Sequence, residues 1–170
     1  MKRPVPGDCN EYFFGYASQV EDDDVLGALE RQLEETTGRL SALSDERALF
    51  RYAPEKWSVK EVVGHLIDSE RIFACRALWF ARSAPQPLPG FDENEYVAAS
   101  DFDARPLAEL VEELRTVRAA TLSLFRGLNE TELERTGTAN DALFRCRSIP
   151  WILAGHELHH RGVLGARYGI

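Results

Sequence analysis

Cysteine is scarce in this sequence. The chain has three cysteines, Cys9, Cys75 and Cys146, which lie far apart and form no CxxC pair. An odd and scattered set excludes a closed disulfide framework and a zinc site built from cysteines. A chain without disulfides is typical of a reducing compartment, so we expect a cytoplasmic protein. Helical periodicity places Cys75 on the polar side of its helix, and we interpret it as an incidental thiol.

Clusters of positive charge and long hydrophobic runs are also absent. The 170 residues include 20 basic and 28 acidic side chains, for a net charge of −8, with no block of Lys and Arg. Such a chain lacks the positive surface that displaces counterions from phosphates, which disfavours nucleic acids and anionic membranes as partners. No apolar run approaches the roughly 20 residues that cross a bilayer. The first residues, MKRPVPGDCNEYFF, contain no apolar segment typical of a secretion signal, so we do not expect secretion.

Sustained alternation of β-branched residues is missing, and helical periodicity takes its place. Apolar residues recur every three or four positions in four stretches, residues 23–44, 58–83, 106–128 and 148–168. Ser58 and Glu61 form a capping box at the start of the second stretch. Residues 84–104 are too many for a tight turn between the second and third stretches. These features predict an all-α fold, an up-and-down four-helix bundle with a long crossover between helices 2 and 3.

The chain length fits one domain, residues 1–170. Residues 1–21 precede the first long helix and include four aromatic residues, and we expect them to form an N-terminal arm that packs on the bundle. Helical projection places Trp151 and Leu158 opposite the histidines of the fourth helix. Either this arm or a second copy in a homodimer would cover them, and we favour the arm.

The four histidines fall in two places. His65 lies in the second helix, and His156, His159 and His160 lie in the fourth, in the sequence GHELHH. His156 and His160 are one helical turn apart near the centre of the apolar stripe, so both imidazoles can reach one ion. His65 is the remaining candidate for a third ligand from a facing helix. The alternative is that these are hydrogen-bonded core histidines, and the pattern lacks the HExxH form of a metalloprotease.

Other polar residues have two interpretations each. Glu70 and Arg118 interrupt the apolar stripes of the second and third helices. They either pair as a buried ion pair that fixes helix register, or act at a metal site, with Glu70 as a base or supporting residue and Arg118 as an anchor for an anionic substrate group. The crossover residues 92–95 either place polar groups near a cavity or form a solvated acidic loop, and we favour the loop.

Three segments of the sequence resemble the DinB/YfiT-like superfamily of metalloenzymes: RYAPEKWSVKEVVGHLIDSERIF, PLPGFDENEYV and AGHELHHRGVLGARY. The arm EYFFGYASQV is also similar to that of one subgroup. The resemblance implies a bundle with a long crossover and a divalent metal ion, zinc or nickel, held by His65, His156 and His160. It also implies coordination positions open to water or substrate. The sequence departs from the family pattern at HELHH, in which either His159 or His160 could be taken as the second ligand of the fourth helix. The position of His160 in the apolar stripe and the spacing in the family both favour His160.

The same resemblance guides the prediction of function. Some relatives transfer low-molecular-weight thiols to electrophiles, others are hydrolases, and many are dimers. We therefore predict a divalent-metal-dependent enzyme that acts on a small molecule, as a hydrolase or a thiol S-transferase. The alternative is a non-catalytic bundle that binds metal or a ligand, stress-linked or serving as a structural dimer.

Overall fold

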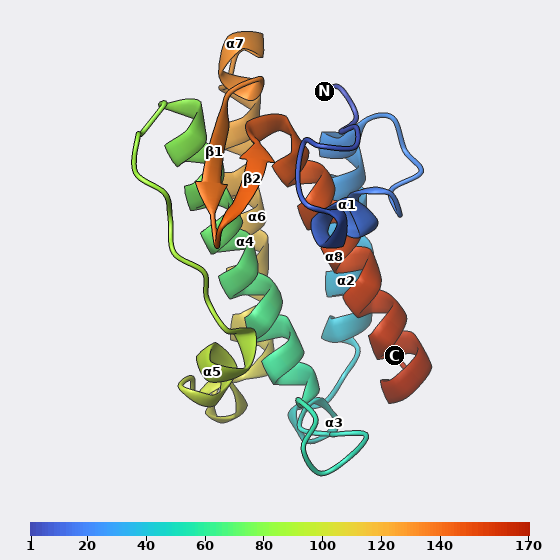
Figure 1. Cartoon of the computed structure of the whole chain (residues 1–170). Coiled ribbons are helices and arrows are strands. Elements are labelled where there is room, and N and C mark those ends of the chain that lie inside the picture. The colour runs from blue at the N-terminus through green and yellow to red at the C-terminus, as the bar shows by residue number, and fades with distance from the viewer.

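Four long helices form the body of the molecule (Figure 1). The computed structural model describes residues 1–170. The helices are α2 (Val25–Ser41), α4 (Val59–Ala81), α6 (Leu107–Arg126) and α8 (Ile149–Val163). Helix α4 packs against α6, α6 against α2, α2 against α8, and α8 closes the ring against α4. This arrangement confirms the predicted helical bundle, and no helix combines the length and apolar character needed to cross a membrane.

The crossover lies between α4 and α6, as predicted. It carries the short helices α5 (Glu93–Ala98) and η1 (Phe102–Ala104) and runs back along the bundle, so that α4 and α6 point in the same direction (Figure 1). Its contact with α4 depends on Gly64, because a Cβ there would lie 2.4 Å from the ring of Phe102. The crossover is therefore packed close to the start of α4.

The helix ends follow the sequence signals. At the start of α4, the Ser58 hydroxyl accepts the Glu61 amide at 3.0 Å, and the Glu61 carboxylate accepts the Ser58 amide at 2.8 Å, which confirms the capping box. Helix α8 has Pro150 in its first turn and continues into a π-helical turn, η3 (Leu164–Tyr168). Gly169 ends it with a left-handed φ of 69°, as helix-terminating glycines do.

A β-hairpin occupies a stretch in which we expected only turns. Strands β1 (Thr136–Ala139) and β2 (Ala142–Arg145) pair antiparallel through a two-residue turn. Asn140 and Asp141 adopt φ values of 50° and 56° there, the left-handed conformations that suit such turns. The prediction missed the hairpin because strands of four residues are too short to show a period-2 pattern. The hairpin also pairs with the crossover, since the amide of Leu88 donates to Thr138 at 2.9 Å.

The remaining elements are short: α1 (Glu11–Ala17), α3 (Asp45–Ala48), α7 (Glu130–Leu133) and η2 (Cys146–Ser148). Helix α1 packs against α8, and Gly155 makes the contact possible, because a Cβ there would lie 1.9 Å from the backbone oxygen of Tyr16. Residues near the N-terminus are thus held directly against the helix that carries three of the histidines.

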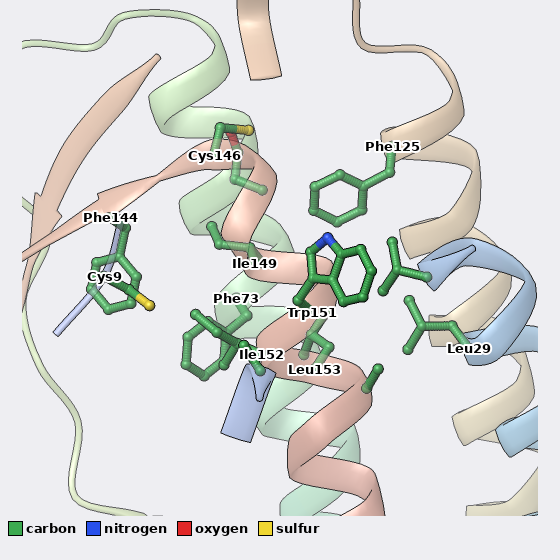
Figure 2. Close-up of a cluster of buried hydrophobic side chains, with 14 of the residues drawn as sticks. Cys9, Leu29, Phe73, Phe125, Phe144, Cys146, Ile149, Trp151, Ile152 and Leu153 are labelled. Atoms are coloured by element: carbon green, nitrogen blue, oxygen red, sulfur yellow. The ribbon is translucent and has the colours of Figure 1, made fainter. Parts of the chain in front are cut away.

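We expected the N-terminal arm or a second copy to cover Trp151, and the arm does so only together with α2 and α6. The Trp151 side chain is fully buried in a core cluster with Leu29 and Phe125 (Figure 2), and the guanidinium of Arg3 lies 4.4 Å from its ring centroid. The projection of a single helix could not show that α2 packs along this side of α8 as well. Leu158 is half-buried at the edge of the same cluster.

Candidate metal centre

The rings of His65, His156 and His160 meet between α4 and α8. The Nε2 atom of His156 lies 3.1 Å from Nε2 of His65 and 3.1 Å from Nε2 of His160. One nitrogen from each ring lies within 4.8 Å of the others. The structure therefore brings together the three histidines that the sequence singled out.

Neighbouring side chains hold these rings in place. The Ser69 hydroxyl lies 3.4 Å from Nδ1 of His65, the nitrogen that faces away from the other rings, and the Trp57 ring packs on His65 with centroids 4.8 Å apart. The Tyr16 ring packs edge-on against His156 at 5.4 Å. Residues from the α4 cap, from α4 itself and from α1 thus fix the orientation of the imidazoles.

Burial keeps the three imidazoles neutral. It lowers the pKa of His65 to about 4, with a smaller contribution from His159. It lowers the pKa of His156 to about 3 and that of His160 to about 2, and in both cases the neighbouring histidines add to the effect. Neutral imidazole is the form that binds metal ions, so the nitrogens are ready to act as ligands at neutral pH.

The spacing of the nitrogens fits a shared metal ion. Nitrogen ligands about 2.0–2.1 Å from one zinc ion stand roughly 3.0–3.4 Å from each other. The two Nε2 separations from His156, both 3.1 Å, fall in that range, and all three ligand nitrogens lie within 4.8 Å of one another. Imidazole nitrogens suit zinc and nickel among other divalent ions, and three of them leave at least one coordination position for another ligand.

A cavity of about 460 Å³ opens onto this cluster. Sixteen residues line it, and they come from the N-terminal arm, α4 and the residues before it, the crossover, the hairpin turn and α8: Asn10, Tyr12, Phe13, Tyr16, Trp57, His65, Ser69, Phe73, Arg76, Phe91, Glu93, Asn140, Ile152, His156, His159 and His160. The histidine cluster therefore forms part of the wall of a space large enough for a small molecule. Glu93 is the one carboxylate in the lining, so residues 92–95 are not merely a solvated loop.

The sequence analysis missed several residues that line this cavity. Tyr12 and Tyr16 were considered only as cover for another face of α8, yet their hydroxyls lie 3.0 Å apart at the cavity. Arg76 was not considered, although a signal existed. His65, Ser69, Phe73 and Arg76 follow each other by three or four residues, so they share one face of α4.

Glu70 and Arg118 form a buried ion pair away from the cavity. The Arg118 guanidinium donates two 2.8 Å hydrogen bonds to the Glu70 carboxylate and one of 2.8 Å to Glu157, and its third nitrogen donates to the Leu29 carbonyl at 2.7 Å. The Thr36 hydroxyl donates to Glu157 at 2.5 Å. These contacts match the first interpretation, a buried ion pair that fixes helix register, since they join α2, α4, α6 and α8.

Neither Glu70 nor Arg118 lines the cavity, and both are 2% exposed. Burial acts to lower the pKa of Arg118, but the carboxylates of Glu157 and Glu70 outweigh it and hold that pKa above its usual range. The structure thus gives these two residues no access to a substrate in the cavity. Glu157, which the sequence analysis passed over, completes the network from α8.

His159 stands apart from the three converging rings. Its side chain is exposed, and its ring packs edge-on against Tyr16 at 5.5 Å and against His160 at 5.1 Å. It lines the cavity but is not one of the three nitrogens that lie together.

Known proteins with this architecture include two solved structures. The YfiT protein of Bacillus subtilis, described as "a probable metal-dependent hydrolase with an unusual four-helix bundle topology", superposes with a TM-score of 0.72 at 18% identity, covering 99% of this chain and 94% of that one. A mycothiol-dependent maleylpyruvate isomerase superposes with a TM-score of 0.72 at 14% identity, covering 88% of this chain and 63% of that longer chain. At these identities the likeness shows a shared fold.

Sequence comparisons agree with the structural ones. A protein of Oceanobacillus iheyensis named "Putative metal-dependent hydrolase" is 24% identical over 76% of this chain and 78% of its own length. A protein of Geobacillus thermodenitrificans with the same name is 22% identical over 72% of this chain and 70% of its own. The family model described as the DinB superfamily matches residues 28–164, which include all four long helices except the first three residues of α2. The chain therefore belongs to the DinB superfamily.

Proposed function

We propose that this protein is a metal-dependent enzyme that binds a divalent cation through Nε2 of His65, His156 and His160 and acts on a small molecule. The observation that carries the proposal is the convergence of three neutral imidazoles in the wall of a cavity. The relatives named as metal-dependent hydrolases support the metal. Zinc and nickel are the cations we propose, because imidazole nitrogen is a preferred ligand of both.

The cation and the chain divide the chemistry between them. When bound, the cation supplies Lewis acidity, which polarises a substrate carbonyl and lowers the pKa of a coordinating water or thiol. The Glu93 carboxylate accepts the proton that the nucleophile releases. Burial and the nearby Tyr12 raise the pKa of Tyr16, which therefore stays protonated and can donate a hydrogen bond to the substrate. Phe73 and Phe91 form apolar walls that exclude water.

Two reactions fit this site: hydrolysis, with water as nucleophile, and transfer of a low-molecular-weight thiol to an electrophile. The hydrolase names of the sequence relatives support the first, and the mycothiol dependence of one fold neighbour supports the second. Turnover of model esters by the metal-loaded protein would identify a hydrolase. Turnover of a thiol together with an epoxide or a chlorinated acceptor would identify a transferase, and failure of both assays would contradict the enzymatic proposal.

The metal site is tested by elemental analysis of protein purified without an affinity tag or added metal. We expect one zinc or nickel ion per chain. Replacing His65, His156 or His160 with Ala should abolish binding, because three protein ligands are few enough that each is needed. His159→Ala is the matched control, and it should retain the metal. Equal metal content in all four variants would contradict the proposed ligand set.

The non-catalytic alternative predicts a closed site. A bundle that held metal only for structure would need no space beside the ion, as closed four-ligand zinc sites show. The cavity that reaches all three histidines supports the enzymatic proposal instead. A homodimer remains a prediction, which sedimentation analysis of the full chain would test.

A further inference from the structure

Arg76 is a buried cation without a negative partner. It lies on α4 and is 3% exposed, and its guanidinium forms no ion pair. Its one hydrogen bond runs to the Pro89 carbonyl at 3.3 Å. Its other neighbours are aromatic: the ring centroids of Phe73, Phe91 and Phe144 lie 5.1, 5.8 and 5.8 Å from its central carbon.

These contacts leave most of its hydrogen-bonding capacity unused. A guanidinium has five N–H donors, and the faces of aromatic rings attract its charge without accepting those donors in the plane of the group. Arg118 shows how the same fold treats a buried arginine that serves structure, because two carboxylates and a backbone carbonyl receive its donors. Burial also lowers the pKa of Arg76, which reflects the cost of keeping this charge unpaired.

The unpaired guanidinium lines the same cavity as the histidines. Arg76 is eleven residues beyond His65 on one face of α4, which places their backbones about 16 Å apart along the helix axis. The two side chains therefore reach the cavity from positions about three helical turns apart on α4. Glu93, the single carboxylate in the lining, is exposed and forms no ion pair with Arg76.

We propose that Arg76 binds an anionic group of the substrate, a carboxylate or a phosphate, while the reacting group of that substrate lies at the three histidines. The inference rests on the proposed function for the position of the reacting group, but not for the anion itself. Arginine suits this role because its planar fork matches the paired oxygens of both anions. The substrate class is thus an elongated small molecule with a negative charge at the end remote from the metal.

The test compares two anionic probes with a neutral isostere of one of them. Binding of phenylacetate, its neutral isostere phenylacetamide, and phenyl phosphate is measured by NMR titration at pH 8 with the full-length protein. Both the zinc-loaded and the metal-free forms are used. In the metal-free form an anion cannot bind through the cation. A failure of the Arg76 proposal is therefore observed separately from a failure of the proposed metal site.

We expect both forms of the wild type to prefer at least one anion to the amide by about tenfold or more. Arg76→Gln should remove that preference and leave amide binding unchanged, and Arg76→Lys should retain part of it because the charge stays while the fork is lost. Arg71→Gln is the matched control, because Arg71 lies on the same helix but is exposed and pairs with Glu113 outside the cavity. The affinity for phenylacetate compared with that for phenyl phosphate shows whether Arg76 prefers a carboxylate or a phosphate.

Three outcomes would overturn the proposal. The first is a metal-free wild type that binds the amide as tightly as either anion. The second is an Arg76→Gln protein that keeps the full preference, and the third is an Arg71→Gln protein that loses it equally. If circular dichroism shows that Arg76→Gln does not fold, the preference for anions over the amide in the wild type and in Arg76→Lys still tests the proposal.

Discussion

The three clustered imidazoles make the metal-free protein sensitive to acid. Burial lowers the pKa values of His65, His156 and His160 to about 4, 3 and 2, whereas an unfolded chain takes up these protons near 6.5. Below pH 6.5 the unfolded state therefore binds protons that the folded state does not. The stability that these groups provide is fully present above that pH and is lost as the pH falls toward 4.

The expected size of this effect is up to about 1.4 kcal/mol per pH unit for each histidine. Urea denaturation of the metal-free protein at pH 7.5 and pH 5.5 measures it, since few carboxylates titrate in that interval. His160→Asn should reduce the difference between the two pH values. A free energy of unfolding that is the same at both would show that the rings are more accessible to protons than the structure indicates.

The ion network around Arg118 predicts a large loss of stability when its cation is removed. Arg118→Met leaves the carboxylates of Glu70 and Glu157 buried without their shared partner, which should cost about 3–5 kcal/mol. Arg126→Met on the same helix removes an exposed pair with Glu30 and should cost at most about 1 kcal/mol. Chemical denaturation of both variants gives the comparison, and a similar small loss in both would contradict a structural role for the network.

The sequence analysis identified the histidines of the cavity but not its arginine, because helical spacing places Arg76 on the face of His65 without showing what that face meets. His156 and His160 share a stripe that the sequence of one helix defines, and His65 was the one histidine left elsewhere. Whether Arg118 or Arg76 faces the cavity depends on which helices lie opposite each of them. A charge in an apolar stripe looks the same in sequence when carboxylates neutralise it, as for Arg118, and when aromatic rings surround it, as for Arg76.

At the scale of elements, the docking of α1 on α8 depends on Gly155, which has no side chain. Gly155→Ala would place a methyl group 1.9 Å from the backbone oxygen of Tyr16, which a rigid backbone cannot avoid. We expect the arm to detach at a cost of about 1–3 kcal/mol, taking Tyr12 and Tyr16 away from the cavity. Faster amide hydrogen exchange in residues 11–17 would report the detachment.

Gly162 on the same helix supplies the control. A Cβ at this position meets no atom within 4 Å, so Gly162→Ala should leave the arm in place and stabilise the helix by about 0.5–1 kcal/mol. Both variants should still bind metal, because the histidines lie on other positions of α4 and α8. Identical exchange of residues 11–17 in the two variants would refute the importance of the close contact.

Long elements could be predicted from the sequence, and short ones could not. The four helices of the bundle have 15 to 23 residues each, enough for their apolar stripes and caps to be recognised. The hairpin has four residues in each strand, and its fold depends on tertiary contacts such as that of Gly137, where a Cβ would lie 1.9 Å from Phe80. The crossover was recognised by its length. The position of Glu93 in the cavity could not be predicted, because it depends on where the chain lies against α1 and α8.

At the scale of the whole molecule, the proposed metal site lies where two helices of the bundle have the fewest contacts. Helices α4 and α8 contact each other less than the other neighbouring helix pairs do, and the cavity opens between them. A cation shared by His65 of α4 and by His156 and His160 of α8 would link the two helices across this opening. Binding of the metal should therefore be coupled to the stability of the folded chain.

Removal of the metal should lower the melting temperature of the whole protein. A free metal concentration of about 100 times Kd stabilises the folded state by about 2.7 kcal/mol, which corresponds to roughly 5–10 °C for a chain of this size. Thermal melts with zinc and with a chelator measure the difference, with His156→Ala as the control that should show none. A metal-dependent shift of equal size in His156→Ala would mean that the cation stabilises the protein from another site, and no shift in the wild type would mean that α4 and α8 are held together without it.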